Sequence, residues 1–504
     1  MSNIASSLAA QAARRGAATA VFADEGDLSW QDWADLSLRS SARFRALGIA
    51  AGSHAALLCT NRPAYLVAWL GLVNSGAVVV SLNSGLVGEG LRYGIRQSKA
   101  SALIVERALY EKLRADLEPV LAGLTLIVFD GEDDLYAEAR RHEPDPVLDA
   151  DGSEPVSIIY TSGTTGPPKG VLNCHEAFLA CGRETATLLD IVEADRIMVF
   201  LPLFHTNPQM YAVMTALETG CALVIRPKLS VSAFFDDARR FGATVFTYVG
   251  TVLAMLTSRI RDEVRDHPIT RCIGGGCPKE VWGPVQERFG ITPHELYGMT
   301  EVGGWVTGNR REAYRFGSVG KARPDVEVAV FDAQDRPVPP GTPGEIVVRP
   351  KEPDTILLGY WDNAQASWEA SRNFWFHTGD AGQFDEDGYL YFLGRTKEII
   401  RRGGENISPF EIETVLLDHP GIRDAAVVAV PDPIWGQEIK AVVVAEGELA
   451  PQAVRDFLDG RVPAYMLPRY VQLVSLIPRT ETQKIQRKAL QENESGVVDL
   501  VGRS

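Results

Sequence analysis

The sequence predicts an α/β protein with a large N-terminal body, residues 1–394, and a small mobile α+β C-terminal lid, residues 395–504. We expect the body to consist of parallel βαβ subdomains plus a small antiparallel β-barrel. Three observations predict this fold class. Short apolar runs alternate with helical patterns over two long stretches, short strands with Gly and Pro turns follow residue 317, and a distinct unit begins after Arg395.

The first alternating stretch runs from Ala18 to about Val128. Its apolar runs at 55–59, 77–82 and 102–105 have the length of buried strands, and helical patterns separate them, as in parallel sheets with crossover helices. The most apolar segment, residues 65–82, is interrupted by Asn-Ser-Gly at 74–76, so it predicts a buried helix followed by a buried strand. The polar, acidic segment 131–154 predicts a loop-rich connection.

The second alternating stretch runs from Ile158 to about Leu296, with candidate strands at 198–204, 222–227 and 244–249. From 317 to 349 the short strands and turns predict the antiparallel barrel or sheet. After Arg395, the runs 424–430 and 439–446 predict strands, and 409–420 predicts a helix.

Composition and charge narrow the class of protein. With 504 residues, of which 45% are hydrophobic and 23% charged, the chain reads as a globular enzyme of several domains. A net charge of -15 argues against a nucleic-acid partner, and no segment predicts a secretory signal or a membrane span. The six cysteines show no metal-binding spacing, so we expect reduced thiols in a cytoplasmic protein. We also expect the protein to be a monomer or a homodimer.

The segment SIIYTSGTTGPPKGV, residues 157–171, places an apolar strand before a loop of hydroxyls and glycines that ends in a lysine. Glycines allow backbone N–H groups to approach phosphate oxygens, hydroxyls add donors, and Lys169 supplies a cation. The spacing is not that of a Walker A loop. The alternative is a solvated turn rich in Gly and Thr.

Further motifs follow in order along the chain. They are YGMTE at 297–301, HTGD at 377–380, DGY at 387–389, GRTK at 394–397, GGENISP at 403–409 and QKIQR at 483–487. Together with the loop at 157–171 they resemble the signature motifs of the adenylate-forming superfamily, which includes acyl-CoA synthetases, nonribosomal adenylation domains and firefly-type luciferases. The resemblance covers nearly the whole chain.

The resemblance implies an acyl-CoA ligase that binds ATP, Mg²⁺, coenzyme A and a carboxylic acid. The acid would form an acyl-AMP with release of pyrophosphate, and the thiol would then take the acyl group. The catalytic residues that it implies are Lys484, Thr300, Glu301, Lys169 and His205. Thr165 and Glu301 would hold the metal, since hydroxyl and carboxylate oxygens suit a hard cation.

The implied nucleotide and thiol contacts span both predicted domains. Tyr297 would stack on adenine, Asp380 would accept the ribose hydroxyls, and Arg395 would add a charged donor. Lys397 would be the hinge of the lid. The other expected contacts are Thr161, Ser162, Gly163, Thr164 and Thr165 for phosphate; Gly275, Gly276, Cys277, Gly298 and Met299 beside the nucleotide; and Gly403 and Gly404 in the pantetheine channel.

The acid-binding pocket is the least specified part. The run 201–207 resembles the family segment that borders the acyl and thiol channels, although His205 could equally be a core histidine. The glycines at 274–276 and 303–304 could leave room for a broad acid, with Trp305 closing the far end and Phe246, Tyr248 and Val249 adding an apolar wall. No lysine or arginine clearly marks a second substrate carboxylate.

Two departures from the family pattern keep alternatives open. Gln483 stands where the family has glycine before the lysine, and Gly250 stands where proline is common. A stand-alone acyl-AMP synthetase that passes the adenylate to a carrier protein or separate partner is therefore the main alternative. A luciferase-like oxidoreductase and a catalytically silent nucleotide sensor are the others.

Overall fold

The computed structural model describes residues 3–161, 167–277, 279–395, 398, 400–402, 405–432, 436–462, 464–479 and 485–501. The chain divides into two compact units. Unit 1 comprises Met1–Val328 and Val348–Phe376, and unit 2 comprises Ala329–Val347 and His377–Ser504. The functional boundary at 394/395 stays a prediction.

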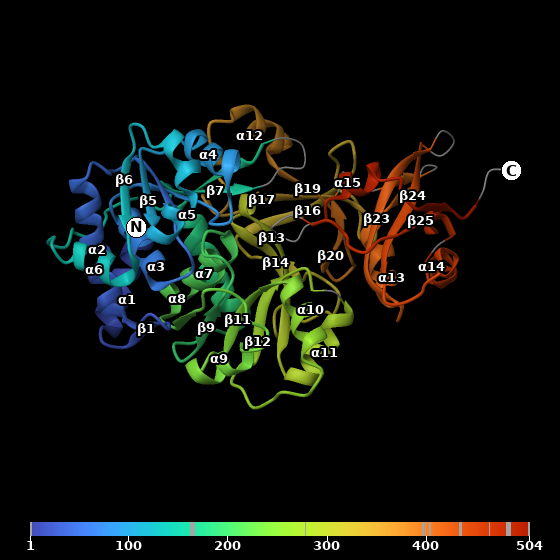
Figure 1. Cartoon of the computed structure of the whole chain (residues 1–504), viewed down its shortest axis with the longest axis horizontal. Helices are drawn as coiled ribbons and strands as arrows, with labels where there is room; N and C mark the ends of the chain where they lie inside the picture. Colours follow the sequence, from blue (N-terminus) through green and yellow to red (C-terminus); the bar gives the residue numbers. More distant parts are fainter. Residues whose placement is uncertain are drawn as a thin grey trace. The chain divides into compact units, whose positions relative to one another are not determined.

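Unit 1 contains two large sheets with mainly parallel strands (Figure 1). The seven-stranded sheet has the order β18 (Gly359–Tyr360), β8 (Lys169–Cys174), β7 (Pro155–Thr161), β4 (Val78–Ser81), β3 (His54–Leu58), β5 (Ala102–Glu106), β6 (Thr125–Phe129). The nine-stranded sheet has the order β15 (Lys321–Ala322), β14 (Gly304–Gly308), β13 (Thr292–Met299), β12 (Arg271–Gly275), β11 (Val245–Val249), β9 (Arg196–Val199), β10 (Ala222–Ile225), β1 (Thr19–Phe22), β2 (Leu28–Ser29).

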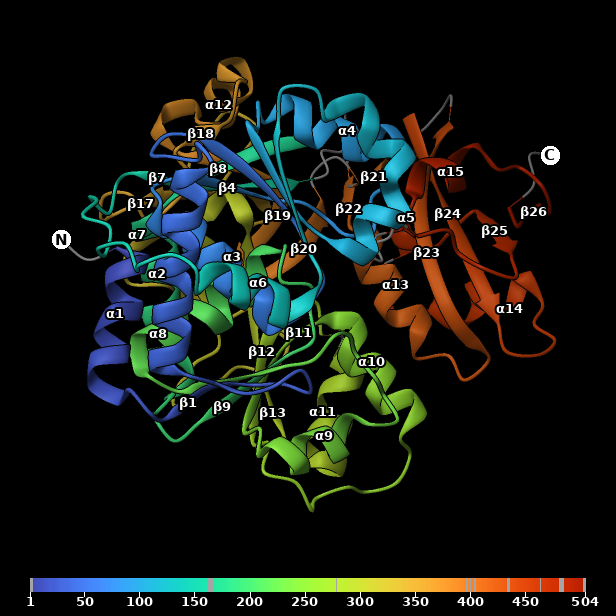
Figure 2. The same cartoon turned by 60° about the vertical axis from the view of Figure 1, so that its left-hand side comes forward.

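The helices of unit 1 connect and cover these strands, as expected for βαβ units. Figure 1 shows α10 and α11 beside β11 and β12, and Figure 2 shows α1, α2 and α3 side by side. The α-helices are α1 (Ile4–Arg15), α2 (Trp30–Ala46), α3 (Pro63–Asn74), α4 (Gly88–Gln97), α5 (Arg107–Leu117), α6 (Gly131–Ala139), α7 (His175–Leu189), α8 (Met214–Thr219), α9 (Phe234–Phe241), α10 (Gly250–Arg259), α11 (Lys279–Phe289) and α12 (Ala364–Ala370). Short 3₁₀ or π turns are η1 (Glu118–Val120), η2 (Asn207–Val213), η3 (Thr300–Val302) and η4 (Arg372–Phe374).

Helix α3 is the centre of the unit 1 core. Every residue from Pro63 to Asn74 is buried, and β4 follows directly, so the predicted buried helix and buried strand are confirmed. Proline at the first position of this helix suits its start, since that N–H would have no intrahelical partner. The core around α3 includes Trp30 and Trp33, and α3 itself contributes Trp69.

Unit 2 contains most of a four-stranded sheet and a separate six-stranded sheet. The first has the order β16 (Val326–Phe331), β17 (Gly344–Pro350), β19 (Phe376–Phe384), β20 (Leu390–Arg395). The second has the order β22 (Glu405–Ile407), β21 (Ile400–Arg402), β24 (Gly436–Ala445), β25 (Tyr470–Leu473), β26 (Val497–Asp499), with β23 (Ile422–Asp432) also on β24. Its helices are α13 (Pro409–Leu417), η5 (Ala464–Met466), α14 (Pro451–Leu458) and α15 (Arg487–Glu492).

The predicted α/β class is confirmed, with parallel sheets in the large part and small antiparallel sheets after it. Two local predictions differ from the structure. The segment 131–154 begins with helix α6, because Leu135, Tyr136 and Ala139 share one buried face. The predicted strand at 198–204 stops as β9 at Val199, and a turn at 201–204 leads into the π-helical segment η2.

Candidate active site

The carboxyl ends of three neighbouring parallel strands carry the predicted nucleotide-binding residues. β11 pairs in parallel with β12, and β12 with β13. Their ends lead to Gly250, to Gly276 and Cys277, and to Thr300 and Glu301. Ligands bind at this edge in open α/β sheets, so the local topology alone makes the edge a candidate site.

Glu301 has two carboxylate oxygens in different surroundings. The residue is only 5% exposed. Its Oε1 accepts hydrogen bonds from Thr161 Oγ1 at 3.0 Å and from Tyr360 Oη at 3.2 Å. Its Oε2 is buried and has no hydrogen-bond partner among the residues that the structure describes.

A buried carboxylate oxygen without a donor is costly unless a cation or another donor reaches it. The environment of Oε2 therefore fits a divalent cation. No cluster of three or more His, Cys, Asp or Glu side chains that could hold a metal is found in the described part of the chain. A single carboxylate suits Mg²⁺, which usually binds one or two carboxylates together with substrate phosphates and water.

Lys169 lies beside the same group of residues. It is the first residue of β8, and its Nζ is 4.7 Å from the centre of the Tyr360 ring. Tyr360 thus contacts both the predicted phosphate-binding lysine and the predicted metal-binding carboxylate. No sequence motif marks Tyr360, because only the pairing of β18 with β8 brings it there.

Thr300 joins the end of β13 to the segment that carries His205. Its Oγ1 lies 2.7 Å from the Oγ1 of Thr206, and both residues are buried. The half-buried ring of His205 packs against Phe204 with centroids 4.4 Å apart. Since Asn207 Nδ2 donates to the carbonyl of Tyr248 at 3.1 Å, the 201–207 segment is tied to β11 as well.

The glycines at the end of β12 and directly after it form a backbone surface with little room for side chains. A Cβ on Gly274 would lie 2.1 Å from the carbonyl oxygen of Tyr248, and Gly276 has a φ of +86°. Behind this turn, Glu295 accepts hydrogen bonds from the backbone N–H groups of Gly276 and Cys277 and from Tyr248 Oη, the last at 2.7 Å. Burial raises the pKa of Glu295 to about 8.

Glu295 is a second residue that the sequence analysis missed. It lies two positions before the first residue of the YGMTE run, and no motif marked it. The structure gives it a clear task, because its carboxyl group fixes the turn at 276–277. The predicted Tyr297 is buried on the same strand, and a Cβ on Gly298 would lie 2.1 Å from the carbonyl oxygen of Gly304.

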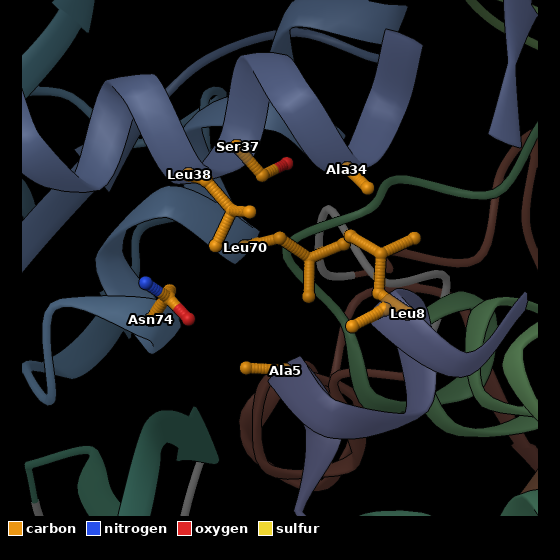
Figure 3. A pocket seen from close by; sticks show the side chains of 8 residues that line it. Ala5, Leu8, Ala34, Ser37, Leu38, Leu70 and Asn74 are labelled. Atoms are coloured by element: carbon orange, nitrogen blue, oxygen red, sulfur yellow. The ribbon is translucent and has the colours of Figure 1, made fainter. Parts of the chain in front are cut away.

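Two residues proposed for the acid pocket have other contacts. Trp305 is buried, and its Nε1 donates to Thr185 Oγ1 at 2.8 Å. Phe246 packs in a core cluster with Phe200 and Phe234. A small hollow among α1, α2 and α3 is lined by residues without ionisable groups (Figure 3), so it is not a candidate active site.

Unit 2 carries the predicted ribose-binding pair. Asp380 on β19 and Arg395 on β20 lie directly opposite each other, with Arg395 Nε 2.9 Å from Asp380 Oδ1. Asp380 is buried, and Arg395 also donates to the carbonyl of Thr378. The pair is therefore held in place by the strand register.

Several predicted residues lie outside the described residues. They are Ser162, Gly163, Thr164, Thr165, Lys397, Gly403, Gly404 and Lys484.

Five of the cysteines are buried and have free thiols. They are Cys59, Cys174, Cys181, Cys221 and Cys272. In the described part of the chain no helix is both long and apolar enough to cross a membrane.

Comparison with known proteins shows the family of the chain. Residues 8–361 match the family model of the AMP-binding enzyme, and residues 411–484 match that of the AMP-binding enzyme C-terminal domain. A crotonobetaine/carnitine–CoA ligase of Salmonella heidelberg (strain SL476) is 31% identical over 470 residues, which cover 90% of each chain. A probable CoA ligase of Humulus lupulus is 32% identical over 465 residues, covering 89% of this chain and 88% of that protein.

Solved structures share the fold over almost the whole chain. The anthranilate CoA ligase AuaEII in complex with anthranoyl-AMP has a TM-score of 0.88 at 25% identity, covering 97% of this chain and 96% of that one. ATP-bound MatB from Rhodopseudomonas palustris has a TM-score of 0.89 at 26% identity, covering 97% and 99%.

The fold, the candidate site at the carboxyl ends of the strands and the comparisons together define an adenylate-forming enzyme. The chain belongs to the AMP-binding enzyme family, within its acyl-CoA synthetases. It is an AMP-forming acid–thiol ligase that uses ATP, Mg²⁺ and coenzyme A, which confirms the class and the cofactors predicted from the motifs.

Proposed function

We propose that this enzyme activates a monocarboxylic acid as its acyl-AMP and then transfers the acyl group to coenzyme A, in the cytoplasm. The observation that carries the proposal is the arrangement around Glu301. A buried carboxylate, one oxygen of which has no hydrogen-bond partner among the described residues, lies at a strand end. Thr161 and Tyr360 hold it, and Tyr360 also contacts Lys169. These groups suit the charge of a metal-bound triphosphate.

In the first step an oxygen of the acid attacks the α-phosphorus of ATP. The bond from that phosphorus to the bridging oxygen of pyrophosphate breaks, and acyl-AMP and pyrophosphate form. We assign Lys169, Thr300 and Lys484 to the phosphate charges, and Asp380 and Arg395 to the ribose. Mg²⁺ held by Glu301, and by Thr165 as implied by the motif, would neutralise charge on the phosphate oxygens.

In the second step the sulfur of coenzyme A attacks the acyl carbonyl carbon. The bond from that carbon to the AMP oxygen breaks, AMP leaves, and the thiol proton passes to solvent. We assign Gly403 and Gly404 to the channel of the thiol, and Lys397 to the hinge. In this proposal one bound nucleotide serves two reactions in turn.

The choice of a monocarboxylic acid follows from the segments assigned to the pocket. These segments are 201–207, 246–249, 274–276 and 303–305, and they contain no lysine or arginine. His205 is the only basic side chain among them. A second substrate carboxylate buried there would lack a charged partner, which is costly.

A screen of acids for pyrophosphate release tests this proposal. The purified enzyme receives ATP, Mg²⁺ and either a neutral monocarboxylic, a dicarboxylic or a quaternary-ammonium acid, with and without coenzyme A. We expect the highest kcat/KM for a neutral monocarboxylic acid, and a thioester only when coenzyme A is present. Preference for a dicarboxylic acid would contradict the pocket assignment. An adenylate that never reaches coenzyme A would favour the stand-alone acyl-AMP synthetase.

A further inference from the structure

Arg323 is an arginine whose side chain is completely buried, and no motif marks it. It follows β15 directly, and its side chain is 0% exposed. Its Nε donates to Asp325 Oδ1 at 2.6 Å, and its guanidinium lies 5.7 Å from the centre of the Trp305 ring. A buried charge of this kind persists only where ion pairs and hydrogen bonds compensate its desolvation.

The other two guanidinium nitrogens donate to two backbone carbonyls from different segments. Nη1 donates to Gly303 at 3.1 Å, and Nη2 donates to Thr355 at 3.4 Å. Gly303 ends the turn η3 that holds Thr300 and Glu301. Thr355 lies a few residues before β18, which carries Tyr360.

The same two segments meet again at Glu301. The backbone N–H of Leu357 donates to the carbonyl of Glu301 at 3.0 Å, and Tyr360 Oη donates to its carboxylate. Asp325 anchors the start of the second segment, because its backbone carbonyl accepts from the N–H groups of Lys351 at 2.8 Å and Glu352 at 3.2 Å. Arg323 and Asp325 thus tie turn 300–303 to segment 351–360.

We propose that Arg323 is a positioning residue that, with Asp325, sets the place of Glu301 Oε2 for Mg²⁺. This inference rests on the proposed function, in which Glu301 holds the metal. The planar guanidinium reaches one carboxylate and two carbonyls in fixed directions, which the ammonium group of a lysine cannot reproduce. Residues that orient a metal ligand typically change metal affinity by about 10- to 100-fold when substituted.

The test measures binding of a non-hydrolysable ATP analogue to the full chain by calorimetry as Mg²⁺ is varied, without acid, so no turnover is required. For Arg323→Lys we expect the Mg²⁺ concentration at half-saturation to rise about 10-fold or more. Affinity for the analogue without Mg²⁺ should stay as in the wild type. Asp325→Asn should shift the Mg²⁺ response in the same direction.

The matched control is Arg271→Lys, with the unfolding midpoint recorded for every variant. Arg271 also joins a carboxylate to a backbone carbonyl, at 2.7 Å from Asp195 Oδ2 and 2.7 Å from the oxygen of Leu189. It contacts neither segment at Glu301, so its Mg²⁺ response should match the wild type even if its stability falls.

The outcomes separate the two proposals. If Arg323→Lys responds to Mg²⁺ as Arg271→Lys does, the arginine only stabilises the fold and the inference is wrong. If Arg323→Lys does not fold, Asp325→Asn decides in the same way, since it keeps the guanidinium. Glu301→Gln tests the proposed function, in which Glu301 holds the metal. An unchanged Mg²⁺ response in that variant would remove Glu301 from the metal site, independently of the result for Arg323→Lys.

Discussion

Individual side chains at the strand ends have unequal surroundings, and those surroundings determine what each group can do. Glu301 leaves one oxygen without a partner in the described part of the chain, whereas both oxygens of Glu295 accept hydrogen bonds. The first carboxylate therefore suits a cation. The second suits a structural task, because it fixes the turn at Gly276 and Cys277.

Glu295 makes stability depend on pH. Burial raises its pKa from 4.5 to about 8, so between these values the folded state holds a proton that the unfolded state releases. The bound proton contributes to the free energy of unfolding, and this contribution is complete below about pH 4.5. It is lost as the pH rises to about 8, at a rate that approaches about 1.4 kcal/mol per pH unit. Glu295→Gln should remove this dependence, as seen in denaturant unfolding at pH 5 to 9.

The control for this series is Glu193→Gln, since Glu193 is an exposed carboxylate that pairs with Arg15. Its unfolding free energy should follow the wild-type curve across the pH range. If the unfolding free energy of Glu295→Gln also followed the wild-type curve across this pH range, Glu295 would already be ionised in the folded protein at neutral pH.

At the scale of single residues, sequence motifs marked the residues that we assign to substrate contacts. They did not mark the residues that hold those side chains in place. Thr300, Glu301 and Lys169 were selected because each lies in a short local pattern. Tyr360 and Arg323 act through partners far along the chain, and such partners become visible only when strand pairing is known. The predicted roles themselves stay predictions.

Among the elements, the turn η3 between β13 and β14 is a tightly constrained part of the site. Gly303 has a φ of +66°, and a Cβ there would lie 2.2 Å from the carbonyl oxygen of Thr355. Gly303→Ala should therefore push segment 351–360 away from Glu301. We expect lower stability and weaker Mg²⁺-dependent nucleotide binding, measured by denaturant unfolding and calorimetry.

Gly123→Ala is the control for backbone strain alone. Its φ is +82°, and a Cβ there would meet nothing within 4 Å. It should cost about 1 kcal/mol from the left-handed conformation and leave nucleotide binding unchanged. Equal effects of the two substitutions on nucleotide binding would contradict the close fit of η3 on segment 351–360.

Buried parallel strands were the elements that the sequence predicted best. The runs at 55–59, 77–82 and 102–105 became β3, β4 and β5, because continuous apolar runs of that length suit strands covered on both faces. Helix α6 was missed, because its acidic first turn masks a short apolar face. The four-stranded sheet could not be predicted as a whole, since β19 and β20 join β16 and β17 from a distant part of the chain.

For the whole molecule, different residues of unit 2 are assigned to the two steps of the reaction. Lys484 is assigned to formation of the adenylate only. Lys484→Ala should lower acid-dependent exchange of pyrophosphate into ATP by about 100-fold or more, the usual cost of losing a charge-stabilising group. Thioester formation from supplied acyl-AMP and coenzyme A should be largely spared.

Lys488→Ala provides the matched control, since Lys488 is a neighbouring exposed lysine, with a side chain 87% exposed, near Glu492. Both half-reactions should proceed at the wild-type rate in that variant. Equal loss of the two half-reactions in Lys484→Ala would remove the separate role of this lysine.

The path of the carboxylate oxygen tests the central claim most directly. An acid found by the screen is labelled with ¹⁸O in its carboxyl group and converted with ATP, Mg²⁺ and coenzyme A, and the products are analysed by mass spectrometry. The account predicts AMP with one ¹⁸O atom and unlabelled pyrophosphate, because the carboxylate oxygen attacks the α-phosphorus. Unlabelled AMP, or ADP together with labelled orthophosphate, would contradict it.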